Sequence, residues 1–227
     1  MSEAAQAMDR MYRRQRHIYD ASRKFYLLGR DAAIDALAPP RGGSVLEIGC
    51  GTGRNLVRIA RTYPEARCFG LDVSAAMLDT AGRAIARAGL SSRIRLACAD
   101  ATDFSPQTLF GRTGFDRIVI SYALSMIPPW EAVIDEAAGH LGVGGTLHVV
   151  DFGGQGGLPR PFREALNRWL SAFSVTPRAT LPLALAETAA ARGLSCTVRQ
   201  RYRGYAVHGI LSRQVSSAQS ASAPAAI

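Results

Sequence analysis

Short apolar runs alternate with amphipathic segments over most of this chain. Apolar strands flanked by helices are typical of a parallel sheet that is covered on both faces. The pattern therefore predicts an α/β fold built as a doubly wound sheet. The predicted strands are 44–49, 66–72, 93–98, 115–121 and 145–152, and the predicted helices are 54–63, 74–89, 104–110, 130–140, 160–173 and 182–192.

The C-terminal part of the pattern differs from the alternation before it. Segments 195–201 and 205–212 are strand-like and are separated by a break at Gly204, which predicts a closing antiparallel pair. From residue 214 to residue 227 the chain is rich in Ser, Ala and Gln, so we expect a disordered tail.

The N-terminal segment reads as helical over residues 3 to 37. The pairs Met11-Tyr12, Ile18-Tyr19 and Phe25-Tyr26 recur every seven residues, and seven helical steps return to within about 20° of the start, so they form one stripe. Arginines lie mostly off this stripe. The segment is either a helix packed on the core or a lid over a bound ligand that also meets an anionic membrane surface. We expect a lid over residues 1–38, and the main domain over 39–213.

The richest local signal is the stretch from Val45 to Leu56, which reads VLEIGCGTGRNL. A predicted strand runs into glycines at alternate positions, and a helix follows whose free N–H groups face the loop. Asp72 ends the next strand, where an acid can bind the hydroxyls of a ribose. The dinucleotide pattern G-x-G-x-x-G fails in both registers, because Arg54 and Leu56 occupy the third glycine position.

What is present, G-x-G-x-G preceded by an acid, resembles motif I of the class I S-adenosylmethionine methyltransferases. Four more segments resemble later motifs of that family in the right order: 72–78, 98–101, 115–122 and 141–150. The resemblance implies a seven-stranded Rossmann-like sheet with S-adenosylmethionine as cofactor and no metal. It places Asp72 on the ribose, Met77 near the adenine and Asp100 near the adenine amino group. The cofactor residues that it implies are Glu47, Gly49, Gly51, Gly53, Asp72, Val73, Met77, Asp100, Ala101 and Ser121.

Composition limits the partners of such a domain. The formal net charge is +9 and Lys24 is the only lysine, so the positive charge is nearly all arginine and favours anions such as phospholipid headgroups or nucleic acid. No run approaches the ~20 apolar residues of a membrane span, and no signal-type segment opens the chain, so a cytoplasmic protein is expected. The four cysteines lack C-x-x-C spacing; three lie in or beside predicted buried strands, so we expect reduced core thiols and no zinc.

The acceptor is expected at the carboxyl end of the fourth strand. The residues there, beginning Ser121-Tyr122-Ala123-Leu124, lack the acid-or-amide, Pro-Pro and aromatic sequence of DNA amino-methyltransferases, so no nucleic-acid partner is expected. Segments 19–31 and 121–128 together resemble the bacterial N-methyltransferases of betaine-lipid synthesis, which trimethylate diacylglyceryl-homoserine. The resemblance implies a lipid amine as substrate and peripheral contact with the membrane. It is shared in part by soluble phosphatidylethanolamine N-methyltransferases.

Tyrosine faces attract ammonium groups, so several tyrosines are candidates for holding the substrate. We expect Tyr122 and Tyr19 to position it, with Tyr202 and Tyr205 as further candidates. His17 is the histidine to test as a base, whereas His148 is expected to be structural. Arg30 either pairs with a carboxylate or headgroup, or is an exposed surface arginine. A soluble or quinone-type acceptor, and a non-catalytic nucleic-acid-binding protein on the same fold, remain alternatives; the oligomeric state is left open.

Overall fold

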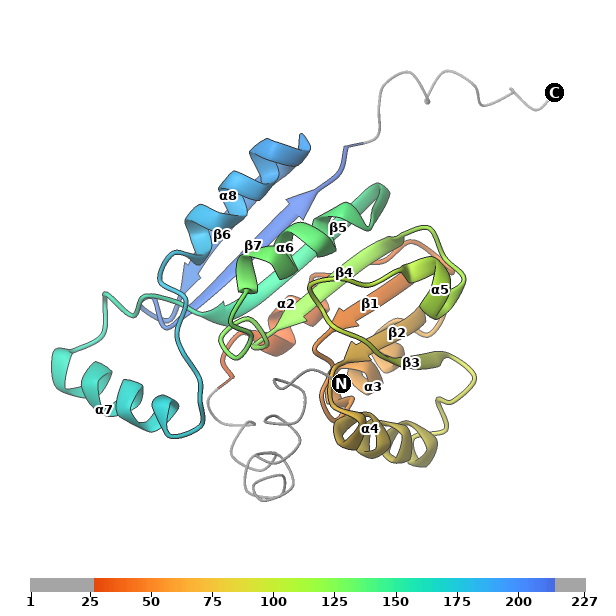
Figure 1. Ribbon diagram of the computed structural model, residues 1–227, viewed down its shortest axis with the longest axis horizontal. Coiled ribbons are helices and arrows are strands. Elements are labelled where there is room, and N and C mark those ends of the chain that lie inside the picture. Colours follow the sequence, from red (N-terminus) through yellow and green to blue (C-terminus); the bar gives the residue numbers. More distant parts are fainter. Residues whose placement is uncertain (1–26, 215–227) are drawn as a thin grey trace.

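A computed structural model describes residues 27–214, and its centre is one seven-stranded sheet in the order β3-β2-β1-β4-β5-β7-β6 (Figure 1). The first five strands are parallel, β7 runs antiparallel to β5, and β6 runs antiparallel to β7. This confirms the predicted α/β fold, with its seven-stranded, mostly parallel sheet and antiparallel C-terminal strands. The strands are β1 Ser44–Ile48, β2 Arg67–Asp72, β3 Ile94–Cys98, β4 Phe115–Ser121, β5 Leu141–Phe152, β6 Ser195–Arg201 and β7 Ala206–Ser212.

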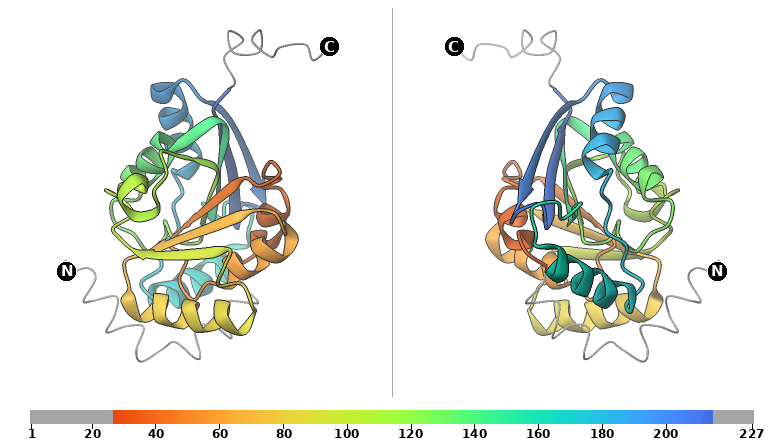
Figure 2. Two further views of the ribbon diagram at one scale, coloured as in Figure 1. Left: turned by 90° about the vertical axis from the view of Figure 1, so that its right-hand side faces the viewer. Right: turned by 90° about the vertical axis from the view of Figure 1, so that its left-hand side faces the viewer.

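Helices cover both faces of the sheet, as the buried clusters and two opposite side views show (Figure 2). Residues of α2, α3 and α4 form one cluster with β1 and β2, and residues of α5, α6 and α8 form the other with β4 and β5. One helix, α7, extends from the carboxyl edge of the sheet (Figure 1). The helices are α2 Arg30–Asp35, α3 Arg54–Thr62, α4 Ala75–Arg87, α5 Pro106–Phe110, α6 Trp130–Gly139, α7 Arg160–Ser171 and α8 Leu181–Arg192.

The expected helix over residues 3 to 37 is wrong at its C-terminal end, and residues 1–26 lie outside the described part of the chain. Leu27 to Gly29 are not helical, and Gly29 (φ 80°) begins the separate six-residue α2. After α2, the Arg117 guanidinium donates hydrogen bonds to the carbonyls of Leu37 and Ala38. Ile34 and Leu37 are fully buried with residues of α3, so α2 is part of the core of the main domain. Tertiary contacts thus decide where this helix begins and ends, and the hydrophobic periodicity of the sequence does not report such contacts.

Two further expectations need correction. Strand β5 begins at Leu141 and not near residue 145, because Phe115 pairs with Leu141 while Arg117 pairs with Thr146, which is a bulge in β5. Cys98 was expected in the core but is exposed, since β3 is the edge strand; Cys50 and Cys68 are buried. Within residues 27–214, no helix combines the length and the apolar character needed to cross a bilayer.

Gly70 offers a test of how tightly α3 packs on the sheet. A Cβ at this position would lie 2.9 Å from Cys50 Sγ and 3.0 Å from Leu96 Cδ2, and closer still to Leu56. We expect Gly70→Ala to lower the free energy of unfolding by about 1–3 kcal/mol through overpacking. In the matched control Gly82→Ala, inside α4, the new methyl group meets nothing within 4 Å, so stability should rise by up to about 1 kcal/mol. Urea unfolding of both variants measures the difference; equal effects would contradict the packing argument.

Candidate cofactor and acceptor site

The predicted cofactor residues lie along the carboxyl edge of the sheet. Because β2, β1 and β4 are neighbours, the residues that end them lie together at this edge, where doubly wound sheets have their ligand-binding crevice. Strand β2, which follows β1 in the chain, lies on one side of β1, and β4 lies on the other side. Doubly wound sheets bind ligands at this kind of position, where the strand order changes direction. The structure thus brings together the loop after β1, Asp72 after β2 and Ser121 at the end of β4.

The loop after β1 is held in a shape that only glycine adopts readily. Gly49, Gly51 and Gly53 have φ of 69°, 53° and 76°. A Cβ on Gly49 would lie 2.7 Å from that of Ala123, and one on Gly53 would lie 2.9 Å from that of Ala81. The outer two glycines therefore permit close packing against the loop after β4 and against α4.

Glu47 and Asn55 fasten the two arms of this loop. Glu47 is buried in β1, and its Oε1 accepts a hydrogen bond of 2.7 Å from the side-chain amide of Asn55 in the first turn of α3. Gly53 is the N-cap of α3 and has no capping side chain, so the positive end of the helix faces the crevice. Asn55 was not among the predicted site residues; its only sequence signal is an amide in the turn that follows the glycines.

Asp72 connects the loop to the start of α4. Its Oδ2 accepts a hydrogen bond of 2.8 Å from the N–H of Gly51, and its Oδ1 accepts one of 3.0 Å from the N–H of Ser74. A carboxylate has about four acceptor positions, so these bonds are compatible with its also accepting from ribose hydroxyls. The ribose role of Asp72 stays a prediction, but the side chain is oriented by two main-chain donors.

The residues assigned to the adenine side lie around the ends of β2 and β3. Val73 is half-buried and Met77 is buried in the first turn of α4, which Ser74 caps. Asp100 is exposed and accepts hydrogen bonds from the N–H and hydroxyl of Thr102, and Ala101 is buried. Their contacts with an adenine stay predictions.

Tyr122 links the loop after β4, called the acceptor loop because the acceptor is expected there, to the segment that precedes α2. It has φ 54°, is buried, and its hydroxyl donates a hydrogen bond of 2.5 Å to the carbonyl of Leu28. Its ring packs edge-on against Phe152, and burial raises the pKa of its hydroxyl well above the usual range. The substrate-positioning role predicted for Tyr122 stays a prediction, and the structure gives the residue an anchoring role. Ser121 is buried beside it, and its Oγ has no hydrogen-bond partner among the described residues.

The loop after β4 is clamped by residues that the sequence did not single out. Asp151, fully buried in β5, accepts hydrogen bonds from the N–H of Ser125 (3.2 Å) and of Phe152 (2.7 Å). The Arg178 guanidinium donates to the carbonyls of Leu124 and Ile127, both at 3.0 Å. An acidic residue at a strand end was the only available signal for Asp151. Arg178, in the linker before α8, had none.

The other sequence candidates fall into three groups. Tyr19 and His17 lie outside the described residues. His148 is buried in β5 with a ring nitrogen 3.0 Å from Thr146 Oγ1, as expected of a structural residue, and burial with His208 nearby lowers its pKa to about 3. The alternative of an exposed surface arginine is wrong for Arg30, which is buried beside Asp31; its ligand role stays a prediction.

Tyr202, Tyr205 and the thiol of Cys50 are the remaining residues that the sequence singled out. Tyr205 is buried against Phe152, whereas Tyr202 is half-exposed. Burial, with Asp72 and Glu47 nearby, raises the pKa of the Cys50 thiol well above its usual range. A raised pKa disfavours the reactive thiolate, which agrees with the expected packing role.

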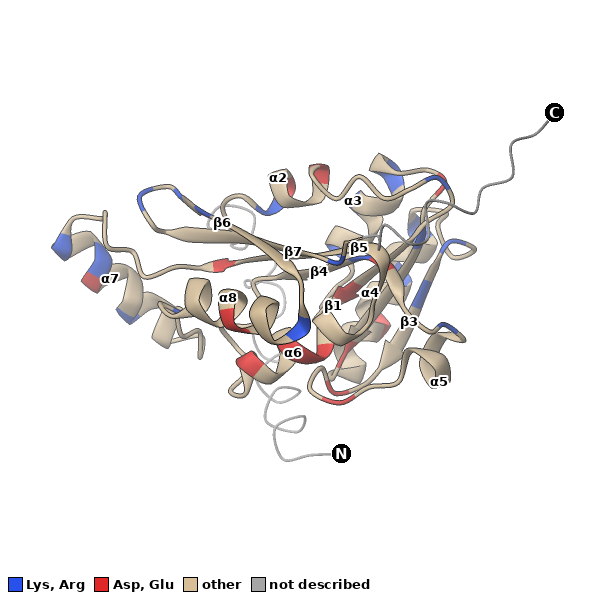
Figure 3. Ribbon diagram, turned by 90° about the horizontal axis from the view of Figure 1, so that it is seen from above, with Lys and Arg blue, Asp and Glu red and all other residues tan. Residues whose placement is uncertain are grey.

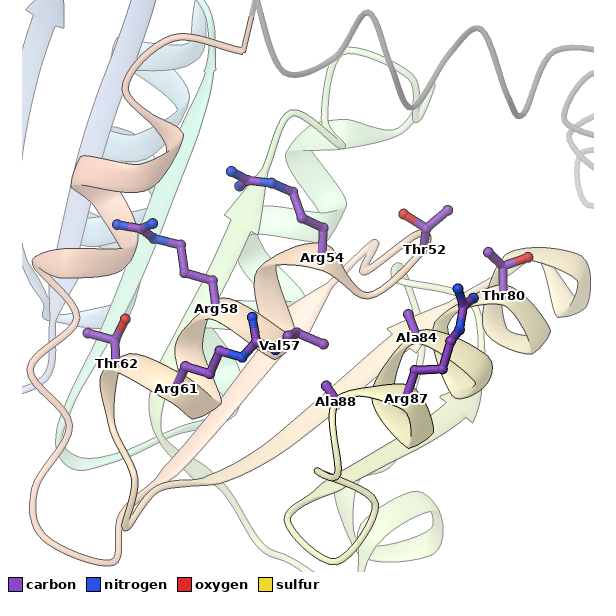
Figure 4. A pocket seen from close by; sticks show the side chains of 10 residues that line it. All are labelled: Thr52, Arg54, Val57, Arg58, Arg61, Thr62, Thr80, Ala84, Arg87 and Ala88. Atoms are coloured by element: carbon purple, nitrogen blue, oxygen red, sulfur yellow. The ribbon is translucent and has the colours of Figure 1, made fainter.

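A separate groove of about 790 Å³ runs between α3 and α4 (Figure 4). It borders the glycine loop only at Thr52 and is otherwise lined by helix residues, with arginines from both sides. Arg54 and Arg58 form ion pairs of 2.8 and 2.9 Å with Asp31 and Asp35 of α2. Much of the positive charge of the groove is therefore used to hold α2 on α3.

Comparison with known proteins agrees with this geometry. Residues 45–145 match the family described as "Methyltransferase domain". The chain is 32% identical over 117 residues to a trans-aconitate 2-methyltransferase of Deinococcus radiodurans (51% of this chain, 41% of that one). It is 32% identical over 150 residues to a ubiquinone/menaquinone biosynthesis C-methyltransferase of Dinoroseobacter shibae (65% of this chain, 56% of that one). The chain thus spans only about half the length of these curated relatives.

Solved structures share the fold. An O-methyltransferase family protein from Burkholderia thailandensis superposes with a TM-score of 0.65 at 19% identity, covering 87% of this chain and 60% of that one. A geranyl diphosphate methyltransferase in complex with S-adenosylmethionine gives a TM-score of 0.61 at 15% identity, covering 82% and 84%. At such identities the likeness concerns the fold alone.

Asp72→Asn tests the cofactor site. The amide keeps the size of the carboxylate and one acceptor oxygen but loses the charge-assisted hydrogen bonds to ribose, so S-adenosylmethionine should bind about tenfold more weakly, ~1.4 kcal/mol by calorimetry. The control Asp79→Asn removes the same charge from an exposed position in α4 and should change affinity less than about twofold. Equal affinities for the two variants would remove Asp72 from the site.

Asp151→Asn tests the buried carboxylate through the pH dependence of stability. Burial raises the pKa of Asp151 from 3.8 to about 6, opposed by hydrogen bonds from Phe152 and Ser125. Between these values the native chain holds a proton that the unfolded chain has lost, so the free energy of unfolding falls as pH rises, by roughly 3 kcal/mol in total. The variant lacks this titration.

Urea unfolding near pH 4 and near pH 7.5 measures this effect. The stability of the wild type relative to Asp151→Asn should be greater at the lower pH, where the native carboxyl is protonated and no ionised carboxylate is buried. Any constant cost of the amide in the loop cancels in this comparison. A wild-type-minus-variant difference that is the same at both pH values would contradict a raised pKa.

Proposed function

We propose that this chain, whose residues 45–145 match a methyltransferase domain and whose cofactor is S-adenosylmethionine, is an N-methyltransferase that acts on the amino group of a lipid headgroup. The proposed substrate is diacylglyceryl-homoserine, which up to three transfers convert to the betaine lipid diacylglyceryl-trimethylhomoserine. The proposed setting is peripheral contact with an anionic membrane surface through the basic N-terminal segment.

One observation carries the lipid part of the proposal. Segments 19–31 and 121–128 resemble the betaine-lipid N-methyltransferases, and they are far apart in the sequence. The hydrogen bond from the Tyr122 hydroxyl to the Leu28 carbonyl joins the second segment to the described end of the first, residues 27–31. Gly49 packs against Ala123, so the loop after β4 lies directly beside the glycine loop. These two contacts support the proposal, because the described parts of both segments lie beside the loop that is expected to hold the cofactor.

Methyl transfer requires the protein mainly to align the amine with the methyl group of the cofactor. S-adenosylmethionine, when bound, supplies a methyl group already activated on a sulfonium. The glycine loop, Glu47 and Asp72 would hold it, and the clamped loop after β4 would hold the amine in line with the methyl group. The amine needs its lone pair, and a pocket that excludes water favours its neutral form.

Two alternatives keep the cofactor. Phosphatidylethanolamine offers the same primary amine on a different headgroup. A soluble or quinone-type acceptor is favoured by the names of the relatives from Deinococcus radiodurans and Dinoroseobacter shibae, a trans-aconitate 2-methyltransferase and a ubiquinone/menaquinone biosynthesis C-methyltransferase. A nucleic-acid-binding protein without catalysis is the distant alternative, motivated only by the charge of +9.

Transfer of label from methyl-labelled S-adenosylmethionine tests the proposal. The full chain is incubated with the labelled cofactor and diacylglyceryl-homoserine in mixed micelles, and lipids are separated by chromatography and mass spectrometry. The expected result is label in products that carry one to three added methyl groups. Asp72→Asn, which we expect to weaken cofactor binding about tenfold, should lower transfer at limiting cofactor by a similar factor.

Parallel incubations with phosphatidylethanolamine, with a demethylated quinone and with trans-aconitate decide among the acceptors. Asp79→Asn is the matched control and should transfer at the wild-type rate. Label in a water-soluble product, with diacylglyceryl-homoserine unlabelled, would exclude the lipid acceptor and leave a methyltransferase for a soluble substrate.

A further inference from the structure

Helix α7 is the part of the molecule that the methyl-transfer site leaves unexplained. It extends from the carboxyl edge of the sheet, beside the layers and not within them (Figures 1 and 2). The glycine-rich segment 153–157 joins it to β5. Only Leu170 of its twelve residues is fully buried, and it packs with Val175 and Phe152. The helix is therefore attached along one edge and exposed over most of its surface.

The exposed surface of α7 carries aromatic residues on one face. Phe162 and Trp169 are seven residues apart, so they lie within about 20° of each other around the helix. Their exposed fractions are 54% and 37%. The Trp169 ring lies 5.1 Å from that of Phe173, which extends the aromatic face beyond the end of the helix. Exposed apolar side chains gathered on one face of a helix mark a candidate interaction surface.

Positive charge flanks this face. Arg160, Arg163 and Arg168 lie on α7, and Glu164 is the only acid of the helix (Figure 3). Glu164 pairs with Arg160 at 2.8 Å, while Arg163 and Arg168 have no carboxylate partner among residues 27–214. An amphipathic helix with aromatic residues on one face and arginines beside it matches the charge and polarity of an anionic lipid surface.

Helix α7 is also connected directly to the acceptor loop. The segment that leaves it donates a hydrogen bond of 2.8 Å from the N–H of Thr176 to the carbonyl of Ser125. Two residues later, Arg178 binds the carbonyls of Leu124 and Ile127. A surface on which α7 rests would therefore lie next to the loop that faces the cofactor crevice.

We propose that α7 docks the protein on an anionic lipid bilayer, with Phe162 inserted among the acyl chains and Arg163 and Arg168 on phosphate groups. The inference deepens the proposed function, on which it rests, by naming a contact with the membrane within residues 27–214. The helix lies in the plane of the interface, and the mouth of the crevice faces the headgroups. A lipid amine then reaches the acceptor loop without leaving the membrane.

Vesicle binding by the full chain tests this docking without using catalysis. Vesicles of phosphatidylcholine and phosphatidylglycerol are sedimented with wild type, Phe162→Ser and the matched control Leu183→Ser. Leu183 is 58% exposed, on α8, so the control removes a similar exposed apolar side chain elsewhere. We expect Phe162→Ser to weaken partition about tenfold, ~1.4 kcal/mol, and Leu183→Ser less than twofold.

The arginines are tested with two double variants that have the same net charge as each other. Arg163→Gln with Arg168→Gln should weaken partition severalfold and reduce its salt dependence. Arg61→Gln with Arg67→Gln removes the same charge at the opposite edge of the sheet and should have a smaller effect. Calorimetric binding of S-adenosylmethionine at wild-type affinity confirms that each variant is folded.

The outcomes separate this inference from the proposed function. Equal loss in Phe162→Ser and Leu183→Ser, or loss in neither, overturns docking through α7 even if the lipid is methylated. Loss of self-association in Phe162→Ser with vesicle binding unchanged also overturns it and assigns the face to a second copy of the chain. Selective loss of vesicle binding supports the docking, and does so even if diacylglyceryl-homoserine proves not to be the acceptor.

Discussion

The close approach of bare main chain to its neighbours in the loop after β1 is the constraint on which the site depends. Gly49 lies against Ala123 and Gly53 lies against Ala81, at distances that leave no space for a side chain. These two contacts set the positions of the acceptor loop and of α4 relative to β1. With the loop so placed, the Gly51 N–H reaches the Asp72 carboxylate, and the start of α3 points into the crevice. Packing and ligand geometry therefore arise from the same glycines.

Carboxylates organise this edge of an otherwise basic molecule. Glu47, Asp72 and Asp151 are each oriented by hydrogen bonds from a neighbouring segment: an α3 amide, the glycine loop and the loop after β4. Burying a carboxylate is costly unless donors satisfy it, so each one fixes the segment that supplies its donor. The result is a candidate site whose segments come from distant parts of the chain and are joined by these hydrogen bonds.

The acceptor side is built in the same way and extends to the surface. Arg178 and Thr176 hold the loop after β4 from the α7–α8 linker, while Tyr122 holds Leu28. The N-terminal segment, the acceptor loop and α7 thus form one connected region at the carboxyl edge. A membrane beneath α7 would act on the same region that positions the amine.

The sequence by itself determined the architecture, because apolar runs and helical periodicity report burial directly, and the alternation of strand and helix permits few arrangements. The sequence also predicted the glycine loop of Gly49, Gly51 and Gly53, and Asp72 at the end of the next strand. Their positions follow from local geometry and from spacing along the chain.

Only the tertiary structure decided the break at Gly29, the exposure of Cys98 and the pairing of Asn55 with Glu47. It alone revealed the clamp of Asp151 and Arg178. Each of these depends on which segments meet across the sheet, and a contact between residues far apart in the chain leaves no period or motif in the sequence.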